Sequence, residues 1–253
     1  MLSIVGLGLN PGHLTVEALE TLRACQKAYL EDYTSQYSSG SLQETEKLIG
    51  KPFLPLGRKQ VEEEFSAVLD EAKLKDVCLA IFGNPLDATT HVQILLDAKE
   101  KQVLTQVLPG IGIFDFSASS GLDRYKFGRT TSIVFHEDGF EPESFYDVIL
   151  ENKKLGLHTL CLLDIKKEES RLMTIRHGLS VLESIEERRE KNVLGESIMV
   201  GMTAMGGSVA QIKAGTMNQL KVCDFISFPQ SLIVCGKLNE KEIEALKGLA
   251  RLE

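Results

Sequence analysis

The sequence predicts an α/β protein, because short apolar runs alternate along it with amphipathic stretches. Loops that contain glycine or proline follow several of these runs. Such loops are typical of the carboxyl edge of an open sheet, where ligands bind. Of the 253 residues, 43% are hydrophobic and 25% are charged, which excludes a collagen-like or mostly disordered chain.

Seven of the apolar runs are expected to be strands. They are Ser3–Leu9, Val77–Phe82, Val103–Leu108, Ser132–Phe135, Thr159–Asp164, Ile198–Thr203 and Leu232–Cys235. Helices are expected at residues 15–27, 59–73, 88–99, 142–152, 171–190, 208–221 and 239–252. Thr15 is the expected N-cap of the first helix. Because parallel neighbours need a crossover connection, the alternation predicts largely parallel strands, in one sheet or in two smaller ones.

The Pro109–Gly110 break follows a predicted strand near the middle of the chain. We expect a domain boundary there, with one α/β domain at residues 1–110 and a second at 111–253. No apolar run approaches 18 residues and no basic leader precedes the first run, so we expect a cytoplasmic protein with no membrane partner.

The net charge of −8 argues against a nucleic-acid partner. The five cysteines are scattered without metal-ligand spacing, so we expect buried free thiols in a reducing compartment and no metal site. His13, His136, His158 and His177 also lack ligand spacing and are expected to be structural.

The first glycine loop reads Gly6-Leu7-Gly8-Leu9-Asn10-Pro11-Gly12. It resembles the dinucleotide fingerprint but departs from it, because the third glycine comes one position late and Pro11 has no N–H to offer a pyrophosphate. A nicotinamide oxidoreductase is therefore disfavoured. The loop is either a small-molecule site without a pyrophosphate or a plain strand-to-helix turn.

The second loop, residues 83–91, follows an apolar strand and opens a predicted helix. Taken alone, it could be a turn in which Asp87 or Thr89 caps that helix.

The two loops together carry a resemblance to a known family. The opening VGLG…PG…LT, followed by Gly83-Asn84-Pro85 and Ala88-Thr89, is similar to the tetrapyrrole-methylase-like family of S-adenosylmethionine-dependent methyltransferases. The segments Tyr29–Ser35, Tyr125–Gly128 and His158–Lys166 resemble the branch of the family that acts in diphthamide synthesis.

The resemblance implies two α/β domains of the tetrapyrrole-methylase type with a cofactor cleft between them. It implies that S-adenosyl-L-methionine is the cofactor and that the chain forms a homodimer. It also implies that the partner and substrate is elongation factor 2, whose 3-amino-3-carboxypropyl-histidine is methylated to diphthine or its methyl ester.

The same resemblance transfers cofactor contacts onto matching positions of this chain. These positions are Leu9, Asn84, Asp87, Gly112, Ile113, Leu163, Met205 and Gln230. The chain departs from the family pattern at Asn84, where the family usually has an aspartate, and at Asp87, where it tends to have a small or apolar residue.

Methyl transfer from a sulfonium disperses positive charge, so an anion beside the sulfur would stabilise the ground state at least as much as the transition state. Asn84 is therefore compatible with catalysis. The apolar members of the set suit the walls of an adenosine pocket, and the glycine loops are expected to offer backbone N–H groups to the cofactor carboxylate. If the acceptor is an amine, Asp87, His91 and Asp164 are candidate bases, although water or a substrate carboxylate could take the proton.

Two other functions remain open from the sequence. One keeps the fold and changes the substrate to a tetrapyrrole or ribosomal RNA. The other is a non-catalytic module that binds the cofactor or the elongation factor.

Overall fold

The computed structural model describes residues 1–252 and divides into two compact units. Unit 1 comprises Met1–Asp115 and the short segments Lys167–Glu169 and Gly206–Ser208, and unit 2 comprises the rest. The boundary expected at 110/111 falls inside unit 1, just ahead of Asp115.

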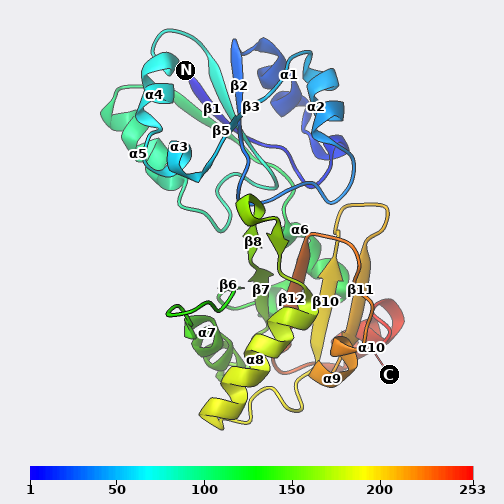
Figure 1. Cartoon of the computed structure of the whole chain (residues 1–253). Helices are drawn as coiled ribbons and strands as arrows, with labels where there is room; N and C mark the ends of the chain where they lie inside the picture. The colour runs from blue at the N-terminus through cyan, green and yellow to red at the C-terminus, as the bar shows by residue number, and fades with distance from the viewer. Residues whose placement is uncertain (253) are drawn as a thin grey trace. The chain divides into compact units, whose positions relative to one another are not determined.

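Unit 1 is built on a five-stranded sheet in which every pairing is parallel (Figure 1). In spatial order its strands are β3 (Leu54–Leu56), β2 (Lys27–Glu31), β4 (Val77–Ile81), β1 (Leu2–Gly6) and β5 (Thr105–Leu108). β1 and β4 are buried along their whole length, as expected for interior strands that are covered on both faces.

Helices cover both faces of this sheet. α3 (Arg58–Glu62), α4 (Ser66–Ala72) and α5 (Val92–Glu100) pack on one face, and α1 (Val16–Ala24) and α2 (Leu42–Ile49) on the other. Successive side chains of β4 point to opposite faces of the sheet, so each face has its own apolar cluster. Val77 and Leu79 belong to one cluster, and Cys78 and Ala80 belong to the other.

Several predictions for unit 1 need correction. Thr15 is confirmed as the N-cap of α1, since its hydroxyl accepts a hydrogen bond from the backbone N–H of Ala18 at 3.1 Å. However, α1 ends at Ala24, because the chain becomes extended at Cys25 and enters β2. The predicted helix at 59–73 is two helices, α3 and α4. β2, β3 and α2 were not predicted from the sequence.

The predicted helix at 88–99 begins only at Val92, and neither Asp87 nor Thr89 caps it. The reason is local, since Ala88 has a φ of 51°, in the left-handed region, which interrupts the right-handed helical path. Residues 83–91 therefore form a loop.

Unit 2 contains a second five-stranded sheet (Figure 1). In spatial order its strands are β11 (Gln211–Gly215), β10 (Met199–Thr203), β12 (Gln230–Val234), β7 (Thr159–Leu163) and β6 (Thr131–Ile133). The helices α7 (Ser144–Lys154), α8 (Ile175–Arg189) and α9 (Met217–Lys221) pack on it, and α10 (Glu240–Leu249) follows its last strand.

The expectation of largely parallel strands is wrong for unit 2, where only β6 and β7 pair in parallel. Residues 208–221 were expected to be one helix, but most of this stretch is β11 followed by the short α9. The connection from Thr203 to Gln211 is too short for a crossover, so β10 and β11 pair antiparallel. A small hairpin of β8 (Ile165–Lys166) and β9 (Arg171–Leu172) follows β7.

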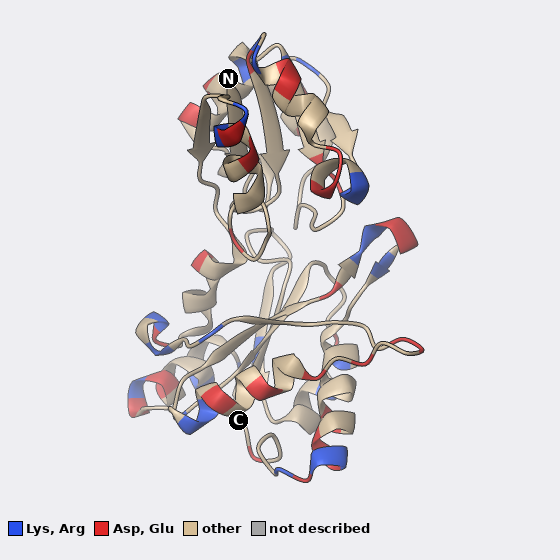
Figure 2. Cartoon of the chain, turned by 90° about the vertical axis from the view of Figure 1, so that its left-hand side faces the viewer, with Lys and Arg blue, Asp and Glu red and all other residues tan. Residues whose placement is uncertain are grey.

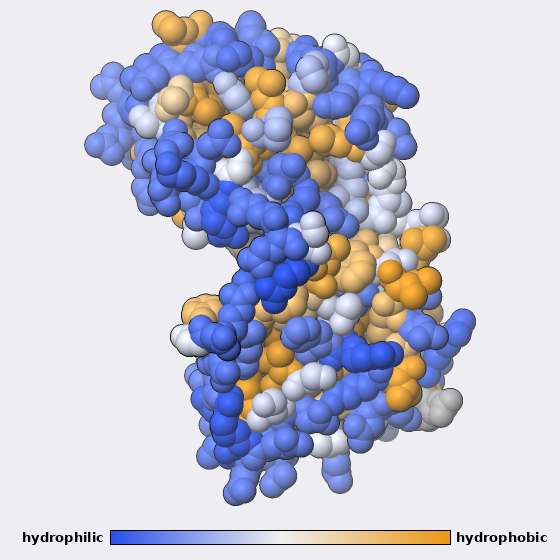
Figure 3. Space-filling view, viewed as in Figure 1, coloured by the Kyte–Doolittle hydropathy of each residue, from blue (hydrophilic) through white to orange (hydrophobic). Residues whose placement is uncertain are grey.

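Figure 2 shows that charged residues concentrate on helices and loops, while the strands of both large sheets carry very few. On the face shown in Figure 3, hydrophilic residues predominate and apolar residues show between them in patches. Among the described residues, none of the helices combines the length and apolar character needed to cross a bilayer. Cys25, Cys78, Cys161 and Cys235 are free and buried as expected, whereas Cys223 is partly exposed.

A buried polar cluster joins α10 to the body of unit 2. His158 is fully buried and approaches Glu242 Oε1 through Nε2 at 2.8 Å. Its Nδ1 accepts a hydrogen bond from the N–H of Gly236 at 3.0 Å, so the proton of the neutral ring must be on Nε2, which donates to Glu242. Lys126 pairs with Oε2 of the same carboxylate. His158 is therefore structural.

We predict that Glu242→Gln destabilises the protein by about 3 kcal/mol, the lower end of the range for breaking a buried ion pair, because the Lys126 side chain is a quarter exposed. Chemical unfolding at pH 7 measures this loss. Glu240→Gln, an exposed carboxylate on the same helix, is the matched control and should change stability by no more than about 0.5 kcal/mol. Equal effects of the two substitutions would contradict a stabilising role for the buried Glu242 carboxylate.

The same cluster predicts a pH dependence. Burial opposes ionisation of Glu242, but hydrogen bonds from Lys126, Asn239 and Asp123 outweigh it and lower its pKa from 4.5 to about 2. The folded state therefore binds this proton less well than the unfolded state, so the carboxylate stabilises the fold fully above pH 4.5. This stabilisation is lost as the pH falls toward 2, and Glu242→Gln should flatten the stability profile in that window.

Candidate functional site

The first two glycine loops of unit 1 are hydrogen-bonded to each other beyond the ends of β1 and β4. Leu7 donates its N–H to Ile81 O at 2.8 Å. Gly8 and Gly83 then exchange two backbone hydrogen bonds, of 3.2 and 2.9 Å. Both glycines have positive φ, of 72° and 75°, which favours glycine at these turns.

The third loop packs against the first two through backbone atoms. A Cβ atom placed on Gly6 would lie 2.5 Å from Gly110 N, and one placed on Gly110 would lie 2.2 Å from Gly83 O. Neither position has room for a side chain. The loops after β1, β4 and β5 therefore meet at the carboxyl edge of the parallel sheet, as the sequence led us to expect.

Four of the residues transferred by the resemblance lie together at this edge. A Cβ on Gly83 would be 3.9 Å from Leu9 Cδ2 and 3.9 Å from Gly112 Cα. A Cβ on Gly112 would be 3.6 Å from Asn84 Cβ and 3.5 Å from Asp87 Oδ2. Leu9 is buried, while Asn84 and Asp87 are half-buried. Ile113 adjoins Gly112 in sequence and begins the short α6 (Ile113–Phe116).

Most of the glycine N–H groups in these loops are already used within the protein. Besides the exchange between Gly8 and Gly83, Gly12 donates to Asn10 Oδ1 and Gly112 donates to Asp115 Oδ2, both at 2.7 Å. The expectation that glycine amides would receive a ligand carboxylate is therefore wrong for these four groups. The side chains of Asn84 and Asp87 are the polar groups nearest to Gly112 at this edge.

Unit 2 brings the other three transferred residues to one edge of its own sheet. Leu163 ends β7, Gln230 begins β12 opposite Thr203, and Met205 follows the end of β10. All three are buried. The Gln230 amide accepts from Ile175 N at 2.7 Å and donates to the carbonyls of Phe225 and Ser227. Its side chain therefore has a structural role.

The three candidate bases have different environments. Asp164 Oδ2 accepts a hydrogen bond from Phe135 N at 3.1 Å, which ties β7 to the chain after β6. His91 is buried behind the second loop, and its burial lowers its pKa. Asp87 is the one candidate of the three that lies within the group around Gly112.

Two residues that shape this edge were not identified from the sequence. His13 has a structural role, as expected, but one at this edge: it accepts a hydrogen bond from the Leu9 N–H through Nδ1 at 3.2 Å and so holds the first loop. Gly8 makes room for it, because a Cβ there would lie 2.3 Å from His13 Cβ. Glu31, at the end of β2, is fully buried with a pKa raised by burial, and it accepts hydrogen bonds from Thr34. The segment Tyr29–Ser35, which carries part of the family resemblance, is the signal that could have indicated it.

The parallel sheet and its converging glycine loops define an α/β protein of the class whose ligands bind at the carboxyl edge of the sheet. Within residues 1–252, no three His, Cys, Asp or Glu side chains are grouped so that they could hold a metal ion.

Comparison with known proteins identifies the family to which this α/β protein belongs. A model of the tetrapyrrole (corrin/porphyrin) methylases matches residues 1–203. Diphthine synthase from Methanococcus maripaludis is 40% identical over 251 residues, covering 98% of both chains. Diphthine methyl ester synthase from Candida glabrata is 35% identical, covering 97% of this chain and 89% of its own. A crystal structure of diphthine synthase superimposes with a TM-score of 0.91 at 30% identity, covering 100% of this chain and 96% of its own.

The chain belongs to the tetrapyrrole methylase family, and it is a methyltransferase. The family named from the loop motifs is thereby confirmed.

We predict that Gly110→Ala destabilises the protein by at least about 1–3 kcal/mol, because the added Cβ meets backbone atoms that cannot rotate away. Gly248→Ala is the control, since nothing lies within 4 Å of a Cβ there and alanine is favoured in a helix by about 0.5–1 kcal/mol. Chemical unfolding of the two variants checks the contrast. A Gly110→Ala protein as stable as the parent would show that the loops do not meet in backbone contact.

Proposed function

We propose that this protein transfers methyl groups from S-adenosylmethionine to the 3-amino-3-carboxypropyl-histidine of elongation factor 2, in diphthamide synthesis. The observation that carries the proposal is the 40% identity to a diphthine synthase over 98% of both chains. The converging loops of unit 1 add support, since they offer a site at the edge where this fold class binds its ligands.

The residues at this edge fit the proposed cofactor. The space beside Gly112 is bordered by Asn84 and Asp87, and a side chain at position 112 would fill it. Leu9 and Ile113 supply apolar surface for the adenosine and exclude water from it. The Asp87 carboxylate can accept hydrogen bonds from ribose hydroxyls or from the cofactor ammonium group. Leu163, Met205 and Gln230 remain predicted contacts that rest on the family resemblance.

When bound, S-adenosylmethionine supplies an electrophilic methyl group on a sulfonium. The chain's own contribution is then mainly positioning, which can supply about 7–11 kcal/mol when the reacting atoms are held at roughly 3–3.5 Å. The hydrogen bond from Leu9 to His13 and the exchange between Gly8 and Gly83 fix the loops that would hold the cofactor. If the acceptor is an amine, Asp87 is our candidate base because it lies beside Gly112, with water or a substrate carboxylate as the alternative; a carboxylate acceptor needs no base.

The proposal is tested with radiolabelled S-adenosylmethionine and elongation factor 2 that carries the aminocarboxypropyl histidine. We expect label on this modified factor and none on elongation factor 2 with an unmodified histidine. Absence of transfer where a relative is active would overturn the proposal. Transfer only to a tetrapyrrole or to ribosomal RNA would favour the other substrates of the family, and cofactor binding without any transfer would indicate a non-catalytic module.

The names of the relatives leave the product open between diphthine and its methyl ester. Intact mass of the modified factor counts the methyl groups, and mild alkali removes a methyl ester but leaves N-methyl groups in place. The homodimer and the cytoplasmic location stay predictions.

Asn84→Asp tests the electrostatic argument about the sulfonium. We predict that S-adenosylmethionine affinity changes by less than tenfold, because we expect the sulfonium to contact neutral carbonyl or amide oxygens, so that a carboxylate at position 84 adds little to binding. Calorimetric titration measures it, with the exposed Asn218→Asp as a charge-matched control. A change of several hundredfold in the Asn84 variant alone would contradict the argument.

A further inference from the structure

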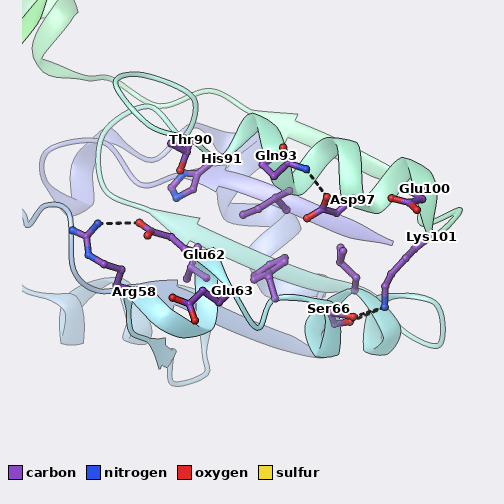
Figure 4. Close-up of a pocket in the computed structure, with 14 residues that line it drawn as sticks. Arg58, Glu62, Glu63, Ser66, Thr90, His91, Gln93, Asp97, Glu100 and Lys101 are labelled. Atoms are coloured by element: carbon purple, nitrogen blue, oxygen red, sulfur yellow. Dashed lines mark hydrogen bonds and ion pairs between the residues drawn. The ribbon is translucent and has the colours of Figure 1, made fainter.

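A second pocket in unit 1 lies between α3–α4 and α5 and has a volume of about 850 Å³ (Figure 4). Its floor is apolar and is formed by Val61, Phe65, Leu69 and Ile94. None of the residues assigned to the cofactor lines it. It is therefore distinct from the site proposed above.

His91 closes one end of this pocket with an unpaired nitrogen. The side chain is only 3% exposed, and Nδ1 lies 3.1 Å from the Pro85 carbonyl oxygen. Because a carbonyl can only accept, Nδ1 must donate, and Nε2 of the neutral ring is left with a bare lone pair. Within residues 1–252, Nε2 has no hydrogen-bond partner. Figure 4 shows the ring at the pocket, pointing toward Glu62.

The two cations that line the pocket are already paired. Arg58 forms an ion pair with Glu62 at 3.0 Å, and Lys101 forms one with Asp70 at 2.8 Å. Lys101 also contacts Ser66, as Figure 4 shows. The pocket therefore has little positive charge left to attract an anion.

Three carboxylates of the pocket lack a countercharge. In the described part of the chain, neither Glu63 nor Glu100 forms an ion pair, and Asp97 accepts only the neutral Gln93 amide, at 2.6 Å. Figure 4 places these carboxylates at separate points along the pocket. These carboxylates and His91 Nε2 are all hydrogen-bond acceptors; Glu63 and Glu100 are exposed, whereas Nε2 is buried.

We propose that this pocket binds an extended cation that carries two or more alkylammonium or guanidinium groups. Its charged donors meet the three carboxylates and His91 Nε2, while its methylene chain lies along the apolar floor. A free polyamine and the basic side chains of a peptide share this chemistry. The inference is independent of the methyl-transfer reaction.

The first test is calorimetric titration of the 253-residue chain with spermine and, separately, with tetralysine peptide, without cofactor. The pocket variant is Glu63→Gln/Asp97→Asn/Glu100→Gln. The control variant is Glu17→Gln/Glu20→Gln/Glu187→Gln, which removes three exposed carboxylates outside the pocket and gives the same net charge.

We expect the pocket variant to bind at least about tenfold more weakly and the control variant to bind within about twofold of the parent protein. The tighter of the two ligands identifies the source of the cation. Equal weakening in both variants would reduce the effect to attraction by net charge and overturn the proposal, as would absence of binding to the parent protein.

The second test uses the unsubstituted protein, so it does not depend on a variant that folds. Nitrogen-15 NMR resolves the ring nitrogens of the five histidines. On saturation with the bound cation, we expect the His91 Nε2 resonance to shift toward that of a hydrogen-bonded acceptor, while those of His13, His136, His158 and His177 stay in place. An unmoved His91 resonance in the saturated protein would overturn the proposed binding mode.

Discussion

Backbone can touch backbone only where no side chain intervenes, and unit 1 depends on this at Gly6 and Gly110, which pack against each other and against the carbonyl oxygen of Gly83. Gly6 ends β1, Gly83 follows β4 and Gly110 follows β5, so the contact fixes the carboxyl ends of three adjacent parallel strands. Leu9, Asn84 and Gly112 come within three residues of these glycines. Their proximity follows from the glycine contact rather than from interactions of their own side chains. Two loop amides are used in the same packing, since Gly8 and Gly83 donate to each other's carbonyl oxygens.

Two buried histidines differ in how many of their ring nitrogens have a hydrogen-bond partner, and this difference distinguishes a structural histidine from one that can bind a ligand. His158 satisfies both ring nitrogens within unit 2, through Gly236 and Glu242, so its position is complete without any ligand. His91 satisfies only one, through Pro85. A buried acceptor without a partner costs free energy, which a folded protein tolerates where a ligand or water can supply the missing donor.

The sequence predicted the framework of unit 1 better than that of unit 2. β1 and β4 are nearly continuous apolar runs followed by glycine turns, a pattern that is typical of interior strands in a parallel sheet. β2 was missed because its residues continue an amphipathic stretch that already resembled a helix. The sequence of β11 favours a helix because an edge strand, which pairs with one neighbour, carries polar residues such as Gln211 and Lys213 that break the apolar pattern of a strand. Strand direction in unit 2 depends on loop lengths and long-range pairing, which local periodicity does not report.

The site residues divide in the same way. Leu9, Asn84, Asp87 and Gly112 were identified from motifs, and the structure brings them together because they follow adjacent strands. His13 and Glu31 carry no motif, and their roles follow from tertiary contacts that no spacing encodes. Gln230 is the opposite case: the family resemblance predicts that it contacts the cofactor, but its side chain donates hydrogen bonds to the carbonyls of Phe225 and Ser227, just before β12.

The position of β1 has a consequence for synthesis of the chain. Leu2 pairs with Val77 on one side and with Thr105 on the other, so an interior strand of the first sheet is translated first and completed last. At about 5–20 residues per second, the ribosome needs roughly 5–20 s to deliver the second neighbour. During that interval a largely apolar strand of the nascent chain lacks one of its neighbours, and chaperones that bind extended hydrophobic segments would find it there.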